Sequence, residues 1–239
     1  YTTAGYWFGK MKASALFASV PFGPEAPEYL AWMWYGNGMK LYQEMYDENG
    51  YNVKVHLCGV IAPETSGWFN EPITNAGQLK GMKMRFFGLG GQVMQSLGVT
   101  TSLLPGGEIF PALEKGAIDA TEFSMPAIDS LLGFHKLVKY NYFPGWHQQA
   151  TTFELMINKD VWNGMSEHQQ MVVDMACRAA VADSLAYTEA IQFTQMTENV
   201  ETNGVKQMYW SEEMLTVFQE AWEAIVEENR TSDPGFKKV

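Results

Sequence analysis

Residues 82–123 read MKMRFFGLGGQVMQSLGVTTSLLPGGEIFPALEKGAIDATEF, and this stretch decides the fold class. Short apolar runs alternate in it with short segments of helical pattern. The expected order is strand, helix, strand, helix, strand, at 82–87, 92–97, 99–104, 108–115 and 118–123. Such alternation predicts α/β units rather than an all-helical bundle.

Two charged residues lie in this stretch where a strand would favour none. Arg85 falls inside the first predicted strand, and Glu122 lies near the end of the third. Ligands of α/β proteins bind beside strand ends and the loops that follow them. Arg85 and Glu122 are therefore the first candidates for a binding site.

The composition of the chain is that of a globular protein with a sizeable core, because 46% of its 239 residues are hydrophobic and 18% are charged. The net charge of −11 argues against nucleic acid or an anionic membrane surface as a partner. No apolar run approaches the roughly 20 residues that a membrane-spanning helix needs. The chain begins at Tyr1 without a methionine, so we expect its start to have been processed, trimmed or lost.

The longest expected element outside this stretch is a helix from Ser166 to about Thr202. Ser166 and Gln169 form a capping box, and neither Pro nor Gly follows before the Asn203-Gly204 stop. The apolar residues lack coiled-coil heptads, so a helix of roughly 50 Å is expected to span two lobes. The other elements expected are helices at 28–49, 73–80 and 211–229, strands at 51–58, 151–158 and 205–210, an irregular loop at 59–70 and a loose tail at 231–239.

The two cysteines, Cys58 and Cys177, are expected to be buried thiols, which is the usual state of free cysteine. A disulfide bond between them is the alternative, because the sequence does not show whether the fold brings the two residues together. Cysteines and histidines show no spacing typical of a zinc site.

Arg85 is one of only three arginines, and Arg178 and Arg230 fall on predicted helices or their ends, where we expect them at the surface. An unpaired cation within an apolar strand would be costly, so Arg85 needs a carboxylate. Two partners are open: a nearby Asp or Glu of the chain, or the carboxylate of a ligand held by two parallel hydrogen bonds.

Glu64, Glu122 and Gln148 form a second candidate group, because each ends or interrupts an apolar segment beside an aromatic residue. Two carboxylates, an amide oxygen and a main-chain carbonyl would make an oxygen-only cation site. Two negative charges favour a divalent ion such as calcium, with sodium still open. For Glu64 the alternative is a solvated loop position. Tyr6 and Trp7 either end a core strand or form an aromatic wall of a cleft.

Enzymatic functions find little support in the motifs. The chain has no Gly-x-Ser-x-Gly, no P-loop and no His-Glu-x-x-His. Glu64 and Glu122 as an acid–base pair are the enzymatic alternative. His147 lies near the proposed site, but a lone histidine is more often structural. We therefore expect no enzyme and no organic cofactor.

In and around the stretch that contains Arg85, the sequence resembles the substrate-binding proteins of TRAP transporters, the DctP family. The likeness is carried by LKGMKMR at 79–85, GGEIFPALEKG at 106–116 and IDATE at 118–122, together with the long helix. Aromatic motifs such as Gly67-Trp68-Phe69 resemble those of the subgroup that binds 2-oxo acids and lactate. The likeness covers nearly the whole chain. The family usually has more chain before Tyr6, including a signal peptide, so we expect the N-terminal part to be missing.

The resemblance implies capture of a small monocarboxylate, such as pyruvate or lactate, in the periplasm and its delivery to the TRAP membrane permease subunits. The family arginine that pairs with the ligand carboxylate falls on Arg85. A calcium or sodium ion would bridge protein and ligand, held by Glu64, Glu122, Gln148 and the main-chain oxygen of Phe123. Related proteins have glutamine, glutamate and tryptophan where this chain has Glu64, Gln148 and Phe123, so the number of carboxylates is kept.

The substrate-binding set implied by the resemblance is Arg85, Glu64, Phe123, Gln148, Tyr6 and Trp7, of which the aromatic residues would line the apolar side. Another organic acid, either a dicarboxylate or a sugar acid, is the alternative ligand. A metal-dependent enzyme acting on a 2-oxo acid is a further alternative. The sequence does not decide whether the last helix mediates dimer formation.

The fold implied is the two-lobe α/β architecture of type II-like periplasmic binding proteins, with the long helix spanning both lobes. Lobe I would consist of 1–62 and 151–190, and lobe II of 63–150 and 191–239. The ligand would lie in the cleft between the lobes, and hinge closure would bury it.

Overall fold

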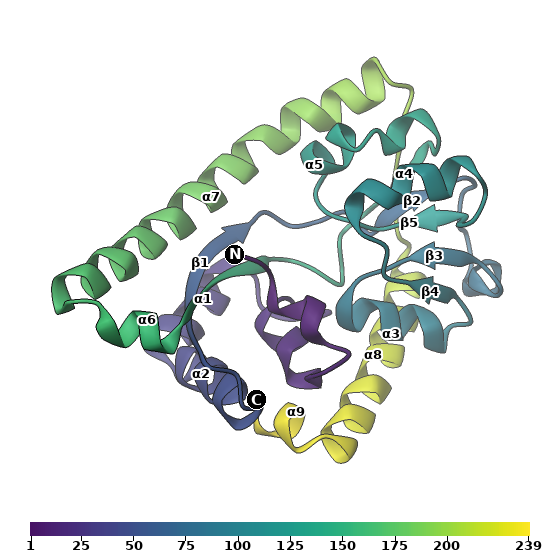
Figure 1. Ribbon diagram of the computed structural model, residues 1–239. Coiled ribbons are helices and arrows are strands. Elements are labelled where there is room, and N and C mark those ends of the chain that lie inside the picture. The colour runs from purple at the N-terminus through teal and green to yellow at the C-terminus, as the bar shows by residue number, and fades with distance from the viewer.

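The computed structural model describes all 239 residues as an α/β protein with two β-sheets and one very long helix (Figure 1). The α-helices are α1 (Ala26–Tyr35), α2 (Gly38–Glu48), α3 (Gly88–Ser96), α4 (Gly106–Glu114), α5 (Pro126–Leu131), α6 (Lys159–Gly164), α7 (Glu167–Glu201), α8 (Glu212–Ser232) and α9 (Pro234–Lys238). The strands are β1 (Val53–Ile61), β2 (Gly67–Phe69), β3 (Lys83–Arg85), β4 (Thr100–Ser102), β5 (Ala120–Thr121), β6 (Tyr140–Phe143), β7 (Thr151–Asn158) and β8 (Lys206–Tyr209). Short 3₁₀ helices are η1 (Ala4–Trp7), η2 (Lys12–Phe17), η3 (Ala76–Leu79) and η4 (Phe134–Lys136).

The larger sheet has six strands in the order β4-β3-β5-β2-β6-β8. Strand β3 is parallel to both its neighbours, and Arg85 pairs with Ser102 of β4 and Thr121 of β5. Strand β2 is antiparallel to β5 and β6, and β6 is parallel to β8. The α/β units expected from 82–123 are confirmed, although each strand is shorter than expected. Because β3 and β5 are parallel, the residues that follow them lie side by side at one edge of the sheet.

The second sheet is the antiparallel pair β1–β7, in which Ile61 pairs with Thr151. Strand β7 has the bounds expected from its alternating apolar residues. Strand β1 begins and ends later than expected and takes in the first three residues of the predicted irregular loop. The end of β1 and the start of β7 therefore bring the segments near Glu64 and Gln148 together.

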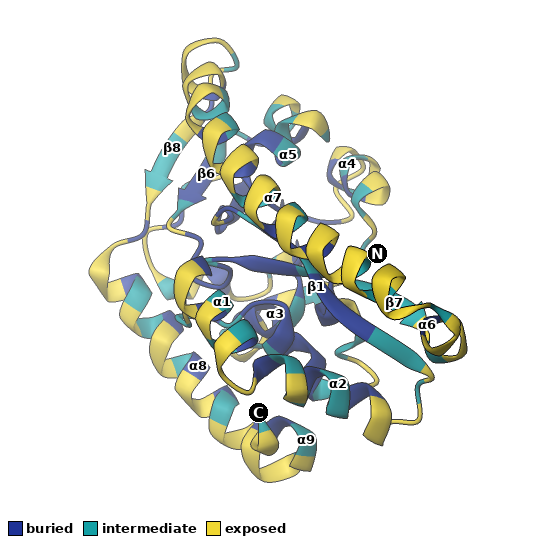
Figure 2. Cartoon of the chain, turned by 90° about the vertical axis from the view of Figure 1, so that its left-hand side faces the viewer, coloured by how far each residue is buried: buried dark blue, intermediate teal, exposed yellow.

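Helix α7 confirms the long helix expected from the sequence. Its N-terminus is a capping box between Ser166 and Gln169. The hydroxyl of Ser184 accepts from the Val60 N–H (3.1 Å), and that of Thr188 accepts from the Ala62 N–H (2.9 Å), so the first part of α7 lies along β1. Farther on, Gln192 accepts a hydrogen bond from the backbone of α5. Figure 2 shows α7 crossing the molecule with its outer face exposed.

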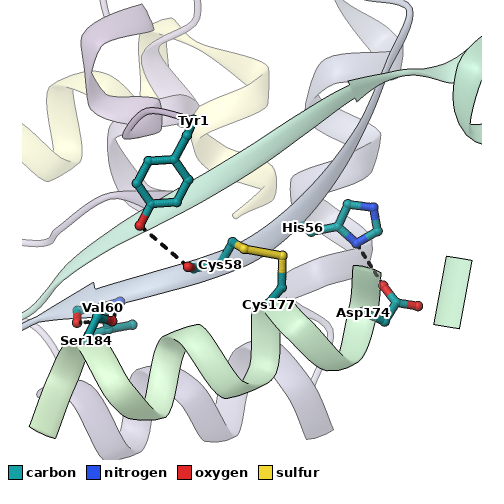
Figure 3. The surroundings of a disulfide bond; sticks show 7 residues. All are labelled: Tyr1, His56, Cys58, Val60, Asp174, Cys177 and Ser184. Carbon is teal, nitrogen blue, oxygen red and sulfur yellow. Dashed lines mark hydrogen bonds and ion pairs between the residues drawn. A yellow bond between two sulfur atoms is a disulfide. The ribbon is translucent and has the colours of Figure 1, made fainter. Parts of the chain in front are cut away.

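The two cysteines do not occur as thiols, so that expectation was wrong. Cys58 of β1 and Cys177 of α7 form a disulfide bond (Figure 3). They are 119 residues apart in the sequence, and only the packing of α7 along β1 brings them together. The bond ties the long helix covalently to the smaller sheet.

Two further expectations were wrong. The helix expected at 28–49 is divided into α1 and α2, because Gly36 has an extended ψ of −147° and a Cβ there would lie 2.7 Å from the Trp32 carbonyl oxygen. The tail is ordered as α9, where Asp233 caps the helix and Phe236 is buried. Both features depend on close contacts in the folded chain, and the spacing of apolar residues in the sequence does not reveal such contacts.

The apolar core is divided between the two sheets. One large cluster lies on the six-stranded sheet and includes Met84, Trp146 and Phe218. A second lies beside the β1–β7 pair and includes Phe17 and Tyr42. This division accords with two lobes, but the lobe bounds at 62/63, 150/151 and 190/191 stay a prediction.

Every helix of the structure is either too short or too polar to span a membrane.

Candidate functional site

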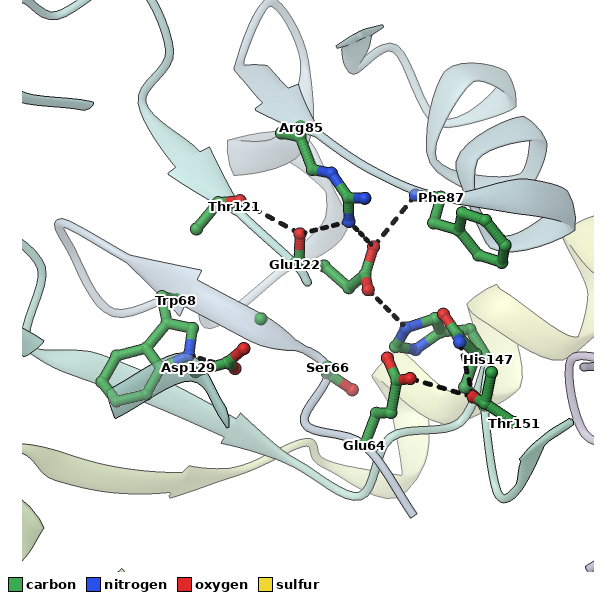
Figure 4. Close-up of polar contacts among 12 residues, drawn as sticks. Glu64, Ser66, Trp68, Arg85, Phe87, Thr121, Glu122, Asp129, His147 and Thr151 are labelled. Atoms are coloured by element: carbon green, nitrogen blue, oxygen red, sulfur yellow. Dashed lines mark hydrogen bonds and ion pairs between the residues drawn. The ribbon is translucent and has the colours of Figure 1, made fainter. Parts of the chain in front are cut away.

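Arg85 ends strand β3 and is only 1% exposed. Its Nε donates to the Leu104 carbonyl (3.2 Å), and its Nη1 donates to the main chain and side chain of Glu122 (2.7 and 3.0 Å; Figure 4). The ring of Phe123 lies 4.9 Å from the guanidinium carbon. The structure thus contains the internal ion pair, which was one of the two partners open for Arg85. The Nη2 amine takes no part in these hydrogen bonds.

Glu122 follows β5 and is completely buried. Its Oε2 accepts from Arg85 and from the Phe87 N–H (2.9 Å), while Oε1 lies 3.7 Å from Nε2 of His147. Burial would raise the pKa of this carboxyl group, but the charge of Arg85 and the neighbouring His147 outweigh it, so the pKa lies below its ordinary value. Glu122 is therefore a buried carboxylate that stays ionised.

Glu64 lies in the connection between β1 and β2 and is 3% exposed, so it is not a solvated loop residue. Its Oε1 accepts from the Thr151 hydroxyl (2.9 Å), whereas Oε2 has no partner. Burial and the negative charge of Glu122 hold the pKa of Glu64 well above its ordinary value. A positive charge beside both carboxylates would instead lower the pKa of Glu64.

Gln148 is held against Glu64 by the turn that follows β6. The Glu64 N–H donates to the Gln148 carbonyl (3.1 Å). Gly145 makes this approach possible, because a Cβ there would lie 2.0 Å from the Glu64 carbonyl oxygen. The Gln148 side chain donates to the Thr151 hydroxyl (2.8 Å), and its amide oxygen has no partner.

Several unpartnered polar atoms converge at this point. One ligand atom each from Glu64, Glu122 and His147 lie within 4.8 Å of one another, and all three residues are buried. The free atoms include Oε2 of Glu64 and Oε1 of Glu122. Leaving such atoms buried without partners costs free energy, which a bound cation would recover. The donor set therefore fits a cation held by two carboxylates.

For His147 the sequence favours a structural role, because it is a lone histidine, and it is not among the predicted ligands. Its ring is 1% exposed, lies against Phe86, and has no hydrogen-bond partner on either nitrogen. Its position directly before Gln148 was the only signal that could have marked it.

A cavity of about 360 Å³ adjoins these residues. Its polar part includes Arg85, Glu64 and Gln148, and Tyr6 and Phe123 contribute aromatic surface. Five of the seven sequence-predicted site residues line this cavity, and Glu122 lies beside it through its ion pair with Arg85, so Trp7 alone is set apart. That residue does not line the cavity and packs instead beside the apolar cluster next to β1–β7.

Asp129 is a fully buried carboxyl group that the sequence did not single out. It lies on α5, and its Oδ2 accepts from Nε1 of Trp68 (2.8 Å). Burial raises its pKa to about 8, with Trp68 opposing the rise and the charge of Glu122 adding to it. Asp129 thus adds a third acid near the two glutamates.

The fold and site define a class: a two-lobe binding protein with a buried charged site and a cavity beside it. The sequence profile of the bacterial extracellular solute-binding proteins, family 7 (DctP), matches residues 1–232. A monocarboxylate 2-oxoacid-binding periplasmic protein from Nostoc sp. is 36% identical over the whole chain. The chain belongs to the DctP family of TRAP solute-binding proteins. It spans 65% of the length of that relative.

Solved structures of TRAP solute-binding proteins agree with this assignment. One from Bordetella bronchiseptica, with calcium and picolinate, is 31% identical with a TM-score of 0.95, over 99% of this chain and 70% of that one. One from Pseudoalteromonas atlantica, with sodium and pyruvate, is 30% identical with a TM-score of 0.93, over 99% and 71%. One from Colwellia psychrerythraea, with calcium and pyruvate, is 31% identical with a TM-score of 0.94, over 99% and 72%. These comparisons confirm the two-lobe fold, and the family consists of transport components rather than enzymes.

Proposed function

We propose that this protein captures a small monocarboxylate, namely a 2-oxo acid such as pyruvate, or lactate, through Arg85 and a bridging cation. The observation that carries the proposal is that Nη2 of Arg85 takes no part in the bonds to Leu104 and Glu122 and that Arg85 lines a cavity beside unpartnered oxygens of Glu64 and Gln148. A ligand carboxylate needs a cationic donor, and a 2-oxo or 2-hydroxy group supplies the second oxygen with which a cation is chelated.

The cation proposed is calcium or sodium, held by Glu64, Glu122, Gln148 and the main-chain oxygen of Phe123. That carbonyl accepts no hydrogen bond from the chain, so it is free for such a role. Relatives at 30–31% identity contain calcium or sodium together with pyruvate, and one contains picolinate, which supports the same pairing of cation and acid here. When bound, the cation would neutralise the buried carboxylates and polarise the oxygens of the ligand.

The proposed mechanism is capture without turnover. Arg85 is held by Leu104 and Glu122 of the protein itself, so little side-chain entropy would be lost on binding. The ring of Phe123 keeps water from one face of the guanidinium. The loaded protein would then deliver its ligand to the TRAP permease subunits in the periplasm. Dimer formation stays a proposal, since one relative is described as a dimer.

Isothermal titration calorimetry with pyruvate and lactate tests this function, in calcium and after EDTA. We expect binding that EDTA weakens and that Arg85→Ala weakens by roughly 30-fold or more, as for loss of one partner of a buried charge pair. Arg85→Lys keeps the charge near Glu122 and should still lose most of the affinity. Arg178→Ala is the matched control, because that arginine is exposed on α7 and stacks on Trp34. Unchanged binding in Arg85→Ala, or no binding of any small carboxylate, contradicts the proposal.

A further inference from the structure

The imidazole of His147 is a buried group to which an oxygen-only cation site gives no role. Its side chain is 1% exposed, and neither ring nitrogen has a hydrogen-bond partner. In a neutral imidazole one nitrogen donates and the other accepts, so leaving both buried without partners costs free energy. A hard cation such as calcium takes oxygen ligands and would leave this cost in place.

The fold holds the His147 ring firmly beside the carboxylates. The ring packs edge-on against Phe86, with 4.9 Å between ring centroids, and against Trp146, with 5.4 Å. Gly90 of α3 leaves the space that this packing needs, because a Cβ at Gly90 would lie 2.8 Å from Cβ of His147. The ring is therefore oriented by packing, and little side-chain entropy would be lost if one of its nitrogens bound an ion.

Nε2 of His147 lies next to the two buried carboxylates. It is 3.7 Å from Oε1 of Glu122, and one ligand atom each from these residues and Glu64 lie within 4.8 Å of one another (Figure 4). A hydrogen bond spans about 2.7–3.2 Å from N to O, so the contact with Glu122 does not satisfy the ring. The ligand atoms of a tetrahedral zinc ion lie roughly 3.3 Å apart at bond lengths of about 2.0–2.2 Å. Small side-chain movements would therefore bring all three groups onto one ion.

The kind and number of these donors favour a transition metal. Imidazole suits zinc and its first-row neighbours, and zinc sites with one open position use three protein ligands from histidine and carboxylates. Glu64 lines the cavity, whereas Glu122 and His147 do not, so the open position would face the cavity. The three ligands come from three separate connections of the chain, which is why no short sequence motif marks the set.

From these contacts we propose that Glu64, Glu122 and His147 also bind a first-row transition-metal dication such as Zn²⁺ or Co²⁺, with Nε2 of His147 as the nitrogen ligand. The inference rests on the cation site of the proposed function, but it does not require a bound organic acid. Because both coordination modes use the two glutamates, zinc and calcium compete for one place.

Calorimetric titration of the metal-free protein with Zn²⁺, Co²⁺ and Ca²⁺, in the absence of any organic acid, tests the metal preference. We expect one zinc ion to bind per chain, at least about tenfold more tightly than calcium, because imidazole is a poor ligand for calcium. Calcium added in excess should weaken the apparent affinity for zinc. Zinc binding weaker than that of calcium, or zinc binding that calcium does not affect, would overturn the inference.

Two substitutions test the nitrogen ligand. His147→Phe keeps a ring against Phe86 and removes both nitrogens, and His147→Gln places an amide there. Loss of a supporting partner already costs about 10–100-fold in metal affinity, so each variant should lose at least about 100-fold for zinc while calcium affinity changes less than about fivefold. His168→Gln, at an exposed position on α7, is the matched control. Equal losses for zinc and calcium would indicate a merely structural role and overturn the inference, as would unchanged zinc affinity in both variants.

The visible absorption of bound Co²⁺ gives a second readout, because its position and intensity depend on the ligands of the ion. The spectrum of the wild-type protein should change in His147→Gln and stay the same in His168→Gln. An identical spectrum in the wild type and His147→Gln would show that the ring is not a ligand. Failure of the wild type to bind pyruvate or lactate in calcium would instead refute the proposed function, since the zinc and cobalt titrations need no acid.

Discussion

At the scale of single residues, the hydroxyl of Thr151 links two proposed cation ligands. It donates to Glu64 and accepts from Gln148, and it is 3% exposed. The oxygens left unpartnered on Glu64 and Gln148 are therefore oriented by one side chain that is itself not a proposed ligand. Such supporting residues commonly matter to metal affinity almost as much as the ligands do.

Thr151→Val keeps the shape of this side chain and removes its hydroxyl. We expect calcium affinity, measured by calorimetry, to fall by about 10–100-fold, because Glu64 and Gln148 lose their common support. Thr197→Val is the control, since its hydroxyl donates to a carbonyl of its own helix at the surface. Calcium affinity equal to that of the wild type would show that the hydroxyl does not orient the site.

Asp129 makes the stability of the protein depend on pH. Its pKa is about 8 in the folded state, against about 3.9 for an unfolded chain. Below about pH 4 the group is protonated in both states, so its favourable contribution is fully present there. As pH rises toward 8, the unfolded chain ionises first, and this group lowers stability by up to about 1.4 kcal/mol per pH unit.

Asp129→Asn should remove this part of the pH dependence, because its amide oxygen can still accept from Trp68. We expect the free energy of unfolding at pH 7, measured by urea denaturation in EDTA, to rise by about 2–4 kcal/mol. The gain should shrink toward zero near pH 4. Asp183→Asn, an exposed position on α7, should leave the pH profile unchanged. A gain that is the same at pH 4 and pH 7 would rule out this explanation.

At the scale of elements, the contact between β1 and α7 is held by several kinds of bond. Ser184 and Thr188 bond to the backbone of β1, and the Cys58–Cys177 disulfide joins the same two elements. A cross-link that closes a loop of 119 residues restricts the unfolded chain strongly.

Cys58→Ala combined with Cys177→Ala should lower the free energy of unfolding by about 2–4 kcal/mol, measured by urea denaturation. The wild-type protein with its disulfide reduced should show the same loss, which separates the effect of the bond from that of side-chain packing. Pyruvate affinity should stay within about threefold, because neither cysteine lines the cavity. An unchanged unfolding midpoint would mean that the disulfide does not stabilise the fold.

At the scale of the whole molecule, two connections and one helix join the two sheets. The polypeptide chain passes between the sheets from β1 to β2 and from β6 to β7, while α7 contacts both β1 and α5. The candidate site lies where these connections meet, since Glu64 and Gln148 belong to them. A ligand bound at the candidate site would therefore couple to the relative position of the proposed lobes.

We expect ligand binding to close the proposed lobes about these connections. Small-angle X-ray scattering should show a smaller radius of gyration when the tightest-binding acid and calcium are both present. Arg85→Ala, measured under the same conditions, should keep the radius of the free protein. An identical radius with and without saturating ligand would argue against closure.

The sequence by itself determined the elements whose signals are local. The alternation in β7, the capping box of α7 and the α/β order of residues 82–123 each depend on neighbours within a few positions. The charges of Arg85 and Glu122 stood out because an apolar strand makes them costly. Glu64 and Gln148 are marked by their places beside aromatic residues in apolar segments, and the family resemblance then gave them the role of cation ligands.

Only the tertiary structure decided which groups meet. The Cys58–Cys177 bond depends on the path of 119 residues, and the place of His147 depends on a turn that Gly145 allows. The same holds for the exclusion of Trp7 from the cavity and for the residues of β1, β7, α5 and α7 that line it. The physical reason is that periodicity reports which face of an element is buried, whereas a site requires knowing which other element covers that face.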